Sequence, residues 1–144
     1  MIGTAHDARK LATGTSLGRR MHDPLSRMQI AWYMVASYDR NPIHIDEPFA
    51  KAAGFPTVIG QGMIPMGWIS GRLVEEVGLH RLRGIGADFL GPLFPGVELS
   101  TDIELAEVSE KPGGVELRWR ISAQAKEGDV KLKGWARTFH EESE

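Results

Sequence analysis

The sequence predicts a single α+β domain in which a long antiparallel sheet wraps around one apolar helix at residues 62–77. Three observations predict this architecture. The chain has 144 residues, 42% of them apolar and 25% charged, which fits one globular domain. One helical segment is far more apolar than the others, and the second half of the chain alternates apolar and polar residues. Because one face of such a sheet needs a cover, we expect the apolar helix to pack against it.

The predicted central helix begins at Gly62 and ends at Gly78. Along it, apolar residues recur at the three- and four-residue intervals that place side chains on one helical face. They are Met63, Met66, Ile69, Leu73 and Val77. We expect this whole stripe, including both methionines, to be buried.

Four strands are predicted in the second half of the chain. They cover residues 83–89, 97–105, 115–124 and 130–139. The last three alternate apolar and polar side chains with a period of two, which is typical of strands with one buried face. Turn-forming residues at 111–114 and 127–129 separate these three strands, and the second turn suits a hairpin.

The N-terminal part of the chain carries weaker patterns. Residues 1–13 show no clear periodicity, so we expect a loosely ordered lead-in there and place the domain at residues 14–144. The domain is then expected to open with a short strand at residues 15–21. A helix capped by Ser26 follows and runs to about residue 37, and a second short helix is expected at residues 47–53.

Composition and charge exclude several classes of function. The formal net charge of −2 provides no broad basic field, so we expect no nucleic-acid partner. The absence of cysteine excludes disulfides and thiolate catalysis, and it fits the reducing cytoplasm, where we expect the protein to be located. The N-terminus lacks the pattern of a signal peptide, and no apolar run is long enough to cross a bilayer, so we expect no membrane association.

Most of the potential chemistry lies between the first two predicted helices. Pro42 prevents a regular helix from joining Asp39 to His44, so a turn has to bring these side chains together. A carboxylate and an imidazole aimed at one point can hold a water molecule, with one group accepting its proton while the other supplies a proton elsewhere. Asn41 has both donors and an acceptor, so it can fix the loop or orient either group.

Gly62 adds a second chemical element to this region. The N-terminus of a helix presents unpaired N–H groups and a partial positive charge, which stabilise a carbonyl oxygen that gains negative charge. Glycine at this position allows a carbonyl group to approach the backbone closely. We therefore expect an anion-stabilising site at Gly62.

These residues resemble the signature of the MaoC-like R-specific enoyl-CoA hydratases. The similarity extends in order through residues 36–46, 49–50, 53–55, 62–63 and 93–96. Its most specific part is the run Asp39-x-Asn41-Pro42-x-His44. The family has a hotdog fold, a curved antiparallel sheet around a long central helix, so the resemblance implies a MaoC-like hotdog domain for residues 14–144.

The resemblance also implies roles for individual residues. Asp39 and His44 would be the catalytic pair that binds and activates water, and the backbone N–H of Gly62 would hold a thioester carbonyl. Asn41 would shape the substrate site. The implied reaction is hydration of a trans-2-enoyl thioester, or the reverse dehydration of an R-3-hydroxyacyl thioester. Which of Asp39 and His44 acts as the base stays open.

Partners are implied by the same resemblance. The substrate would be an acyl thioester of coenzyme A or of acyl carrier protein, and no separate cofactor is expected because coenzyme A enters as part of the substrate. The family usually works as a dimer of hotdog units. Since this chain holds one unit, a homodimer or higher homo-oligomer is implied, with a heterodimer as the alternative.

Two positions depart from the pattern of the family. Tyr38 stands where a small residue, often glycine, commonly precedes the aspartate, and Gln61 stands where histidine commonly precedes the Gly-Met pair. We expect both side chains to contact substrate. Tyr38 could narrow the pocket, whereas Gln61 removes an ionisable group near the site.

Two other functions are compatible with the same residues. A hotdog acyl-CoA thioesterase would hydrolyse the thioester, although the Asp-x-Asn-Pro-x-His motif favours hydration. A non-catalytic acyl-thioester-binding subunit of a heterodimeric dehydratase would bind substrate without turnover, although the intact catalytic pair argues against it.

A metal site is not expected. His44 and Asp46 would point to opposite faces of an extended segment, and no strong ligand spacing links them to another histidine. The histidines considered are His22, His80 and His140.

Two further sets of residues each have a simple structural interpretation and a functional one. Arg72, Arg81 and Arg83 form a solvated basic cluster or bind coenzyme A phosphates, and Trp68, Trp119 and Trp135 pack in the fold or line an acyl tunnel.

Overall fold

The structure, a computed structural model, describes residues 1–126 and 128–142. Glu127, within the predicted hairpin turn, and the last two residues of the predicted domain lie outside the described residues. The helices are α1 (Ala5–Arg9), α2 (Arg27–Ser37), α3 (Glu47–Ala52) and α4 (Met63–Val77), with two 3-10 turns, η1 (Pro42–His44) and η2 (Leu79–Arg81). The strands are β1 (Arg20–His22), β2 (Leu82–Phe89), β3 (Leu99–Lys111), β4 (Gly114–Gln124) and β5 (Val130–Glu141).

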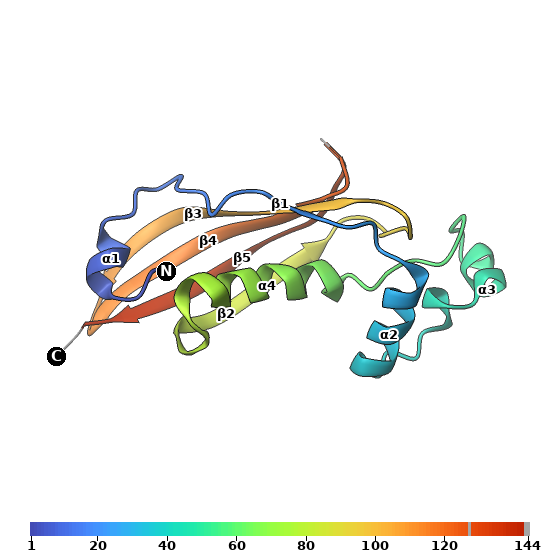
Figure 1. The fold of residues 1–144 in the computed structure, drawn as a ribbon, viewed down its shortest axis with the longest axis horizontal. Coiled ribbons are helices and arrows are strands. Elements are labelled where there is room, and N and C mark those ends of the chain that lie inside the picture. Colours follow the sequence, from blue (N-terminus) through green and yellow to red (C-terminus); the bar gives the residue numbers. More distant parts are fainter. Residues whose placement is uncertain (127, 143–144) are drawn as a thin grey trace.

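The five strands form one antiparallel sheet in the order β1-β3-β4-β5-β2. In Figure 1 the sheet curves over α4, while α2, η1 and α3 lie beyond one end of the sheet, next to the N-terminal end of α4. This arrangement confirms the predicted α+β class and the central helix. It also places the predicted catalytic loop outside the sheet.

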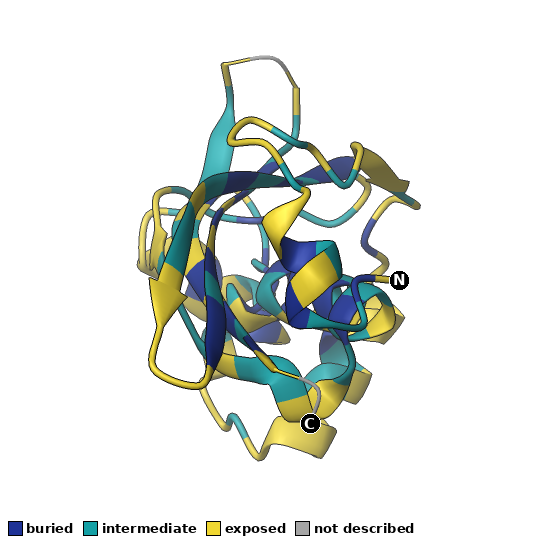
Figure 2. Cartoon of the chain, turned by 90° about the vertical axis from the view of Figure 1, so that its left-hand side faces the viewer, coloured by how far each residue is buried: buried dark blue, intermediate teal, exposed yellow. Residues whose placement is uncertain are grey.

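Alternation along the strands explains why the sheet has one buried face. In β4, Leu117, Trp119 and Ile121 are buried, whereas Arg118 and Arg120 between them are exposed. Successive side chains of a strand point to opposite faces, so the buried series faces the helices. Figure 2 shows the buried residues concentrated between the sheet and the helices. The predicted period of two is therefore confirmed.

The helix α4 provides the cover that the sheet requires. Ile69, Leu73 and Val77 are fully buried in one cluster with residues of β3, β4 and β5. The prediction of a continuous buried stripe was wrong at its first position. Met63 is 47% exposed because the first turn of α4 extends beyond the sheet, and Met66 is only partly buried.

Two strands differ in extent from the prediction. The strand β3 runs to Lys111, six residues further than expected, because its polar half pairs with β4 as far as Gly114. The strand predicted at residues 15–21 is shorter, since β1 covers only three residues and Ser16 forms an isolated bridge with Glu104. Gly18, at φ 87°, separates the two contacts with β3.

The prediction of a loosely ordered lead-in at residues 1–13 was wrong. Residues 5–9 form α1, which is capped by the Thr4 hydroxyl accepting the Asp7 N–H at 3.1 Å. Ala5 and Ala8 are buried in the main core, and the Ile2 N–H donates to the Glu76 carbonyl of α4 at 2.7 Å. This segment therefore belongs to the core.

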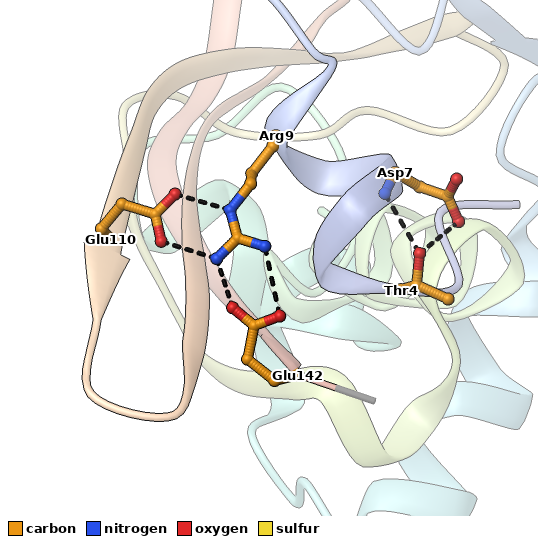
Figure 3. A network of polar contacts seen from close by, with 5 residues as sticks. All are labelled: Thr4, Asp7, Arg9, Glu110 and Glu142. Atoms are coloured by element: carbon orange, nitrogen blue, oxygen red, sulfur yellow. Dashed lines mark hydrogen bonds and ion pairs between the residues drawn. The ribbon is translucent and has the colours of Figure 1, made fainter. Parts of the chain in front are cut away.

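Ion pairs hold the outer side of α1. Figure 3 shows the Arg9 guanidinium between the carboxylates of Glu110 on β3 and Glu142 beyond β5, with two hydrogen bonds of 2.8 Å to Glu110. On the inner side, Arg81 donates to the carbonyls of Gly3 and Val77. The N-terminal segment is thus joined to one end of the sheet, where β3 and β5 end, and to α4.

Deletion of residues 1–13 is expected to reduce the free energy of unfolding by about 3 kcal/mol or more. The deletion uncovers apolar surface of α4 and β4, at a cost comparable to the loss of one large buried side chain. Urea unfolding followed by circular dichroism measures the change. Arg9→Ala is the control, because it removes only exposed ion pairs and should cost little. A truncated chain as stable as the Arg9→Ala variant would contradict the assignment of α1 to the core.

No helix within the described residues is both long and apolar enough to cross a membrane.

Candidate active site

The candidate site lies where the end of α2, the turn η1 and the start of α4 meet (Figure 1). The helix α2 begins with a capping box, in which Ser26 and Gln29 satisfy each other's backbone N–H groups. Tyr38 caps its C-terminal end, and the left-handed conformation of this residue (φ 57°) turns the chain into the predicted catalytic loop. The carboxyl-bearing residue Asp39 is the first residue beyond this turn.

Tyr38 does not contact the cavity described below. Its side chain is 71% exposed, and the Arg40 guanidinium lies 4.0 Å from the centroid of its ring. The two side chains flank Asp39 in the sequence and stack on each other at the surface. Tyr38 therefore closes α2 and is not among the residues that line the cavity, and its contact with substrate stays a prediction.

Asn41 builds the loop. Its Oδ1 accepts the Ile43 N–H at 3.1 Å, which caps η1, and Pro42 occupies the first position of that turn. The Asn41 backbone N–H donates to Asp39 Oδ1, also at 3.1 Å. Asn41 thus holds both ends of the segment that joins the two catalytic candidates, but its side chain does not line the cavity.

His44 and Asp39 are brought together as the sequence predicts. His44 is buried, with 9% of its side chain exposed, and its Nε2 lies 3.2 Å from Asp39 Oδ2. Its Nδ1 lies 2.7 Å from the Ile59 carbonyl oxygen. Because a carbonyl oxygen only accepts hydrogen bonds, Nδ1 carries a proton. A hydrogen bond between Nε2 and the carboxyl group then requires one further proton, held by either partner.

A cavity of about 440 Å³ opens beside this pair. Asp39, His44, Gln61 and Gly62 contribute its polar groups. The rest of its lining is mainly apolar and comes from Phe55, Ile59, Gly60, Met63, Phe89, Leu90, Gly91, Pro92 and Leu93. Gly62 precedes the first residue of α4, and both Gly62 and Met63 line the cavity, so the N-terminus of this helix lies at its wall.

The sequence did not predict the apolar wall formed by residues 89–92. They begin at Phe89, the last residue of the edge strand β2, and their only local signal is the Gly91-Pro92 pair, which indicates a turn. Their place in the cavity depends on a tertiary contact. Gly60 and Leu93 form an isolated bridge, in which the Gly60 N–H donates to the Leu93 carbonyl at 2.7 Å.

Gln61 lies in the wall between the cavity and α2. It is 4% exposed, and its Nε2 is 3.4 Å from the Ile30 carbonyl of α2. Its Oε1 is buried without a hydrogen-bond partner within the part of the chain that the structure describes. The residue joins the start of α4 to α2, and it lines the cavity next to Gly62.

The remaining sequence candidates lie elsewhere. Arg72 donates to the Leu17 carbonyl, and Arg83 donates to the His80 carbonyl, so each has a structural partner. His22 stacks on Trp68 with ring centroids 4.1 Å apart, and Trp119 is buried in the core. None of these side chains lines the cavity. Across residues 1–126 and 128–142, no group of three or more His, Asp or Glu side chains is arranged to hold a metal ion.

Comparison with known proteins identifies the family of this chain. The model of the MaoC-like domain matches residues 9–124. The chain belongs to the MaoC-like domain family. Among curated relatives, the (R)-specific enoyl-CoA hydratase of Aeromonas caviae is 29% identical over 112 residues, which cover 73% of this chain and 80% of that protein. The 3-hydroxyacyl-thioester dehydratase Y of Mycobacterium tuberculosis is 39% identical over 90 residues, 60% of this chain.

Solved MaoC-like structures have the same fold. The R-hydratase PhaJ1 of Pseudomonas aeruginosa superposes with a TM-score of 0.79 at 22% identity, covering 94% of this chain and 86% of that one. The (R)-hydratase of A. caviae gives a TM-score of 0.76 at 24% identity, with 90% and 97% covered. This confirms the hotdog fold. The match of dehydratase Y covers 30% of that protein, and the match of the mouse peroxisomal multifunctional enzyme type 2 covers 12%.

Proposed function

We propose that this MaoC-like protein hydrates trans-2-enoyl thioesters, or dehydrates R-3-hydroxyacyl thioesters in the reverse direction. The observation that carries the proposal is the contact of 3.2 Å between His44 Nε2 and Asp39 Oδ2 in the wall of an apolar cavity. Gly62, at the start of α4, lines the same cavity and would hold the thioester carbonyl. The names of the A. caviae and M. tuberculosis relatives support the same reaction.

The proton balance of hydration fits the pair. The proposed reaction starts with one proton between Asp39 and His44, at the contact of 3.2 Å between Nε2 and Oδ2. The residue of the pair that does not hold this proton accepts a proton from water as the water oxygen bonds to C3. The other residue gives its proton to C2. The pair still holds one proton afterwards, and transfer across the 3.2 Å contact restores the starting state. No redox group takes part, and coenzyme A is involved only as part of the substrate.

The carbonyl at Gly62 makes the addition feasible. When water adds to C3, negative charge moves onto the thioester oxygen as an enolate. Backbone N–H groups at the start of α4 stabilise that charge, and one such donor contributes roughly 3–4 kcal/mol in other enzymes. The mainly apolar lining lowers the local dielectric constant around this interaction, which strengthens it.

We propose that the active assembly contains two hotdog units. The solved structures with this fold include the ChsH1–ChsH2 complex and the HadBC complex of M. tuberculosis, which pair two chains. A homodimer of this chain supplies two units without another gene product, and a heterodimer is the alternative. Size-exclusion chromatography with light scattering, without and with candidate partner chains, distinguishes the two.

Hydration of crotonyl-CoA, followed by loss of the enoyl absorbance, tests the proposed reaction. The assay is repeated with longer, branched and aromatic enoyl-CoAs and with enoyl-acyl carrier protein. A thiol-reactive dye is added in parallel, because release of free coenzyme A would indicate a thioesterase instead. Binding of the thioester without turnover by the purified chain, restored by a second subunit, would indicate the non-catalytic role.

Asn41→Ala is expected to lower kcat for crotonyl-CoA by about 5- to 10-fold. The variant loses the cap on η1, which is worth about 1 kcal/mol in other helices, but it keeps the backbone N–H that holds Asp39. Asn41→Asp retains the cap oxygen and is expected to keep most activity. A loss of 1,000-fold in both variants would contradict a purely positioning role for Asn41.

A further inference from the structure

The ring of Phe89 lies against Gly62, the residue whose backbone N–H is proposed to hold the thioester carbonyl. A Cβ atom placed on Gly62 would lie 2.6 Å from Cδ1 of Phe89, 2.9 Å from Cε1 and 3.0 Å from Cγ. Real Cβ atoms do not approach other atoms so closely, so Phe89 is in contact with the glycine backbone. Any side chain at position 62 would collide with the Phe89 ring, so this ring is the first reason why glycine occupies the position.

The backbone around Phe89 is fixed on both sides. Phe89 is the last residue of β2 and pairs with Leu132 of β5, and the next residue, Leu90, donates its N–H to the Lys131 carbonyl at 2.9 Å. The bridge between Leu93 and Gly60 holds the other end of the segment. The ring therefore projects from a fixed support and is not part of a mobile loop.

The exposure of Phe89 indicates a role in binding. Its side chain is 51% exposed, and it lines the same cavity as Asp39, His44 and Gly62. A large apolar side chain that remains half exposed contributes less to the core than a buried one, and its free face is available to a ligand. A trans-2-enoyl thioester is flat from the carbonyl to C3 because its double bonds are conjugated, so it can lie against an aromatic face.

We propose that Phe89 determines specificity by restricting substrates to enoyl groups without a substituent at C2. This inference rests on the proposed function. When the carbonyl group is bound at Gly62, the next atom of the acyl group is C2. The Phe89 ring, which lies against Gly62, is then beside C2. A hydrogen at C2 fits this space, whereas a methyl group collides with the ring. Pockets that select by one methyl group typically discriminate by about 10- to 200-fold.

Phe89→Ala is the decisive variant, assayed with crotonyl-CoA and trans-2-methylcrotonyl-CoA. We expect kcat/KM for crotonyl-CoA to fall about 10-fold, mainly through KM, because a binding surface is lost. We expect the preference for crotonyl-CoA over the methylated thioester to fall at least about 10-fold, because space opens at C2. Phe49→Ala is the matched control, since Phe49 is 46% exposed and does not line the cavity.

A second pair of variants tests the contact itself. Gly62→Ala is expected to lower kcat/KM for crotonyl-CoA by about 100-fold in the wild-type chain, and by much less when Phe89 is already alanine, because the collision has been removed. Equal losses in the two backgrounds would overturn the assignment of this contact.

Binding measurements separate failure of this inference from failure of the proposed function. The affinities for both thioesters are measured by calorimetry with Asp39→Asn and with Asp39→Asn/Phe89→Ala, which do not depend on turnover. If the wild-type chain hydrates neither thioester, the proposed function fails, and the ratio of affinities still tests Phe89. Two preferences for crotonyl-CoA over the methylated thioester are compared with and without the Phe89 ring: the ratio of the two affinities and the ratio of the two kcat/KM values. If neither ratio changes when the ring is removed, the inference is overturned.

Discussion

Asp39→Asn is expected to lower the hydration of crotonyl-CoA by at least about 1,000-fold without loss of the fold. The amide keeps the shape of the side chain, and Oδ1 can still accept the Asn41 N–H. What is lost is the exchange of a proton with His44 Nε2 across 3.2 Å. Since the pair must hold one proton before and after each turnover, an amide at this position stops the cycle.

His44→Ala is expected to cause a loss of similar size, and the double variant should be little worse than either single one. Groups that act as one unit show this non-additive behaviour. The control is Asp46→Asn, because Asp46 caps α3 through Oδ1 and does not line the cavity. Steady-state kinetics with circular dichroism spectra of each variant make the test. Activity within tenfold of the wild type for either catalytic variant would rule out the assigned pair.

Acidification from pH 7 to pH 4 is expected to lower the free energy of unfolding by about 3 kcal/mol through His140 alone. His140 is fully buried. Its Nε2 is 3.2 Å from Thr138 Oγ1, and that hydroxyl accepts the Trp119 Nε1–H at 3.1 Å. The Thr138 hydroxyl thus contacts both side chains, and the remaining ring nitrogen, Nδ1, has no partner among residues 1–126 and 128–142.

Burial lowers the pKa of His140 to about 4, and the positive charge of Arg81 acts in the same direction. His80 lowers the pKa further, while the Asp7 carboxylate opposes this effect. Because the pKa is lower in the folded chain than in the unfolded one, the unfolded chain binds the proton first as the pH falls. The contribution to stability is complete above about pH 6.5 and is lost as the pH decreases to about 4.

Urea unfolding at several pH values between 8 and 4.5 measures this effect against His140→Gln. The variant has no titrating group at this position, so its stability should change less over the range. The acidic groups Glu47, Glu110 and Glu142, whose pKa values are lowered by their partners, are present in both chains and cancel in the difference. Parallel stability curves for the two chains would show that His140 does not titrate as argued.

The fold was predictable because its signals are local and repeated. The spacing of Ile69, Leu73 and Val77 predicts the buried face of α4, and the alternation along β4 predicts its two faces. The helix α1 was missed because five residues are too few to establish a period. Its signal was the Thr4 cap with Asp7 three residues later, followed by the small buried residue Ala8.

The candidate site was predictable in part. The break at Pro42 implied a turn that brings Asp39 and His44 together, and the geometry has this form. The roles expected for Tyr38 and Asn41 placed them against substrate, but both lie outside the cavity lining. Phe89 could not be predicted, because its contact with Gly62 depends on the register of β2 on β5 and no local pattern encodes it.

Main-chain atoms hold both members of the proposed catalytic pair, Asp39 and His44. The Asn41 N–H binds Asp39, and the Ile59 carbonyl binds His44. Every amino acid carries a carbonyl, and every one except proline carries an N–H, so substitution of Asn41 or Ile59 does not by itself remove these supports. The neighbouring side chains are therefore free to diverge toward new substrates while the pair keeps its orientation. Only proline at position 41, or a displacement of the backbone itself, would release it.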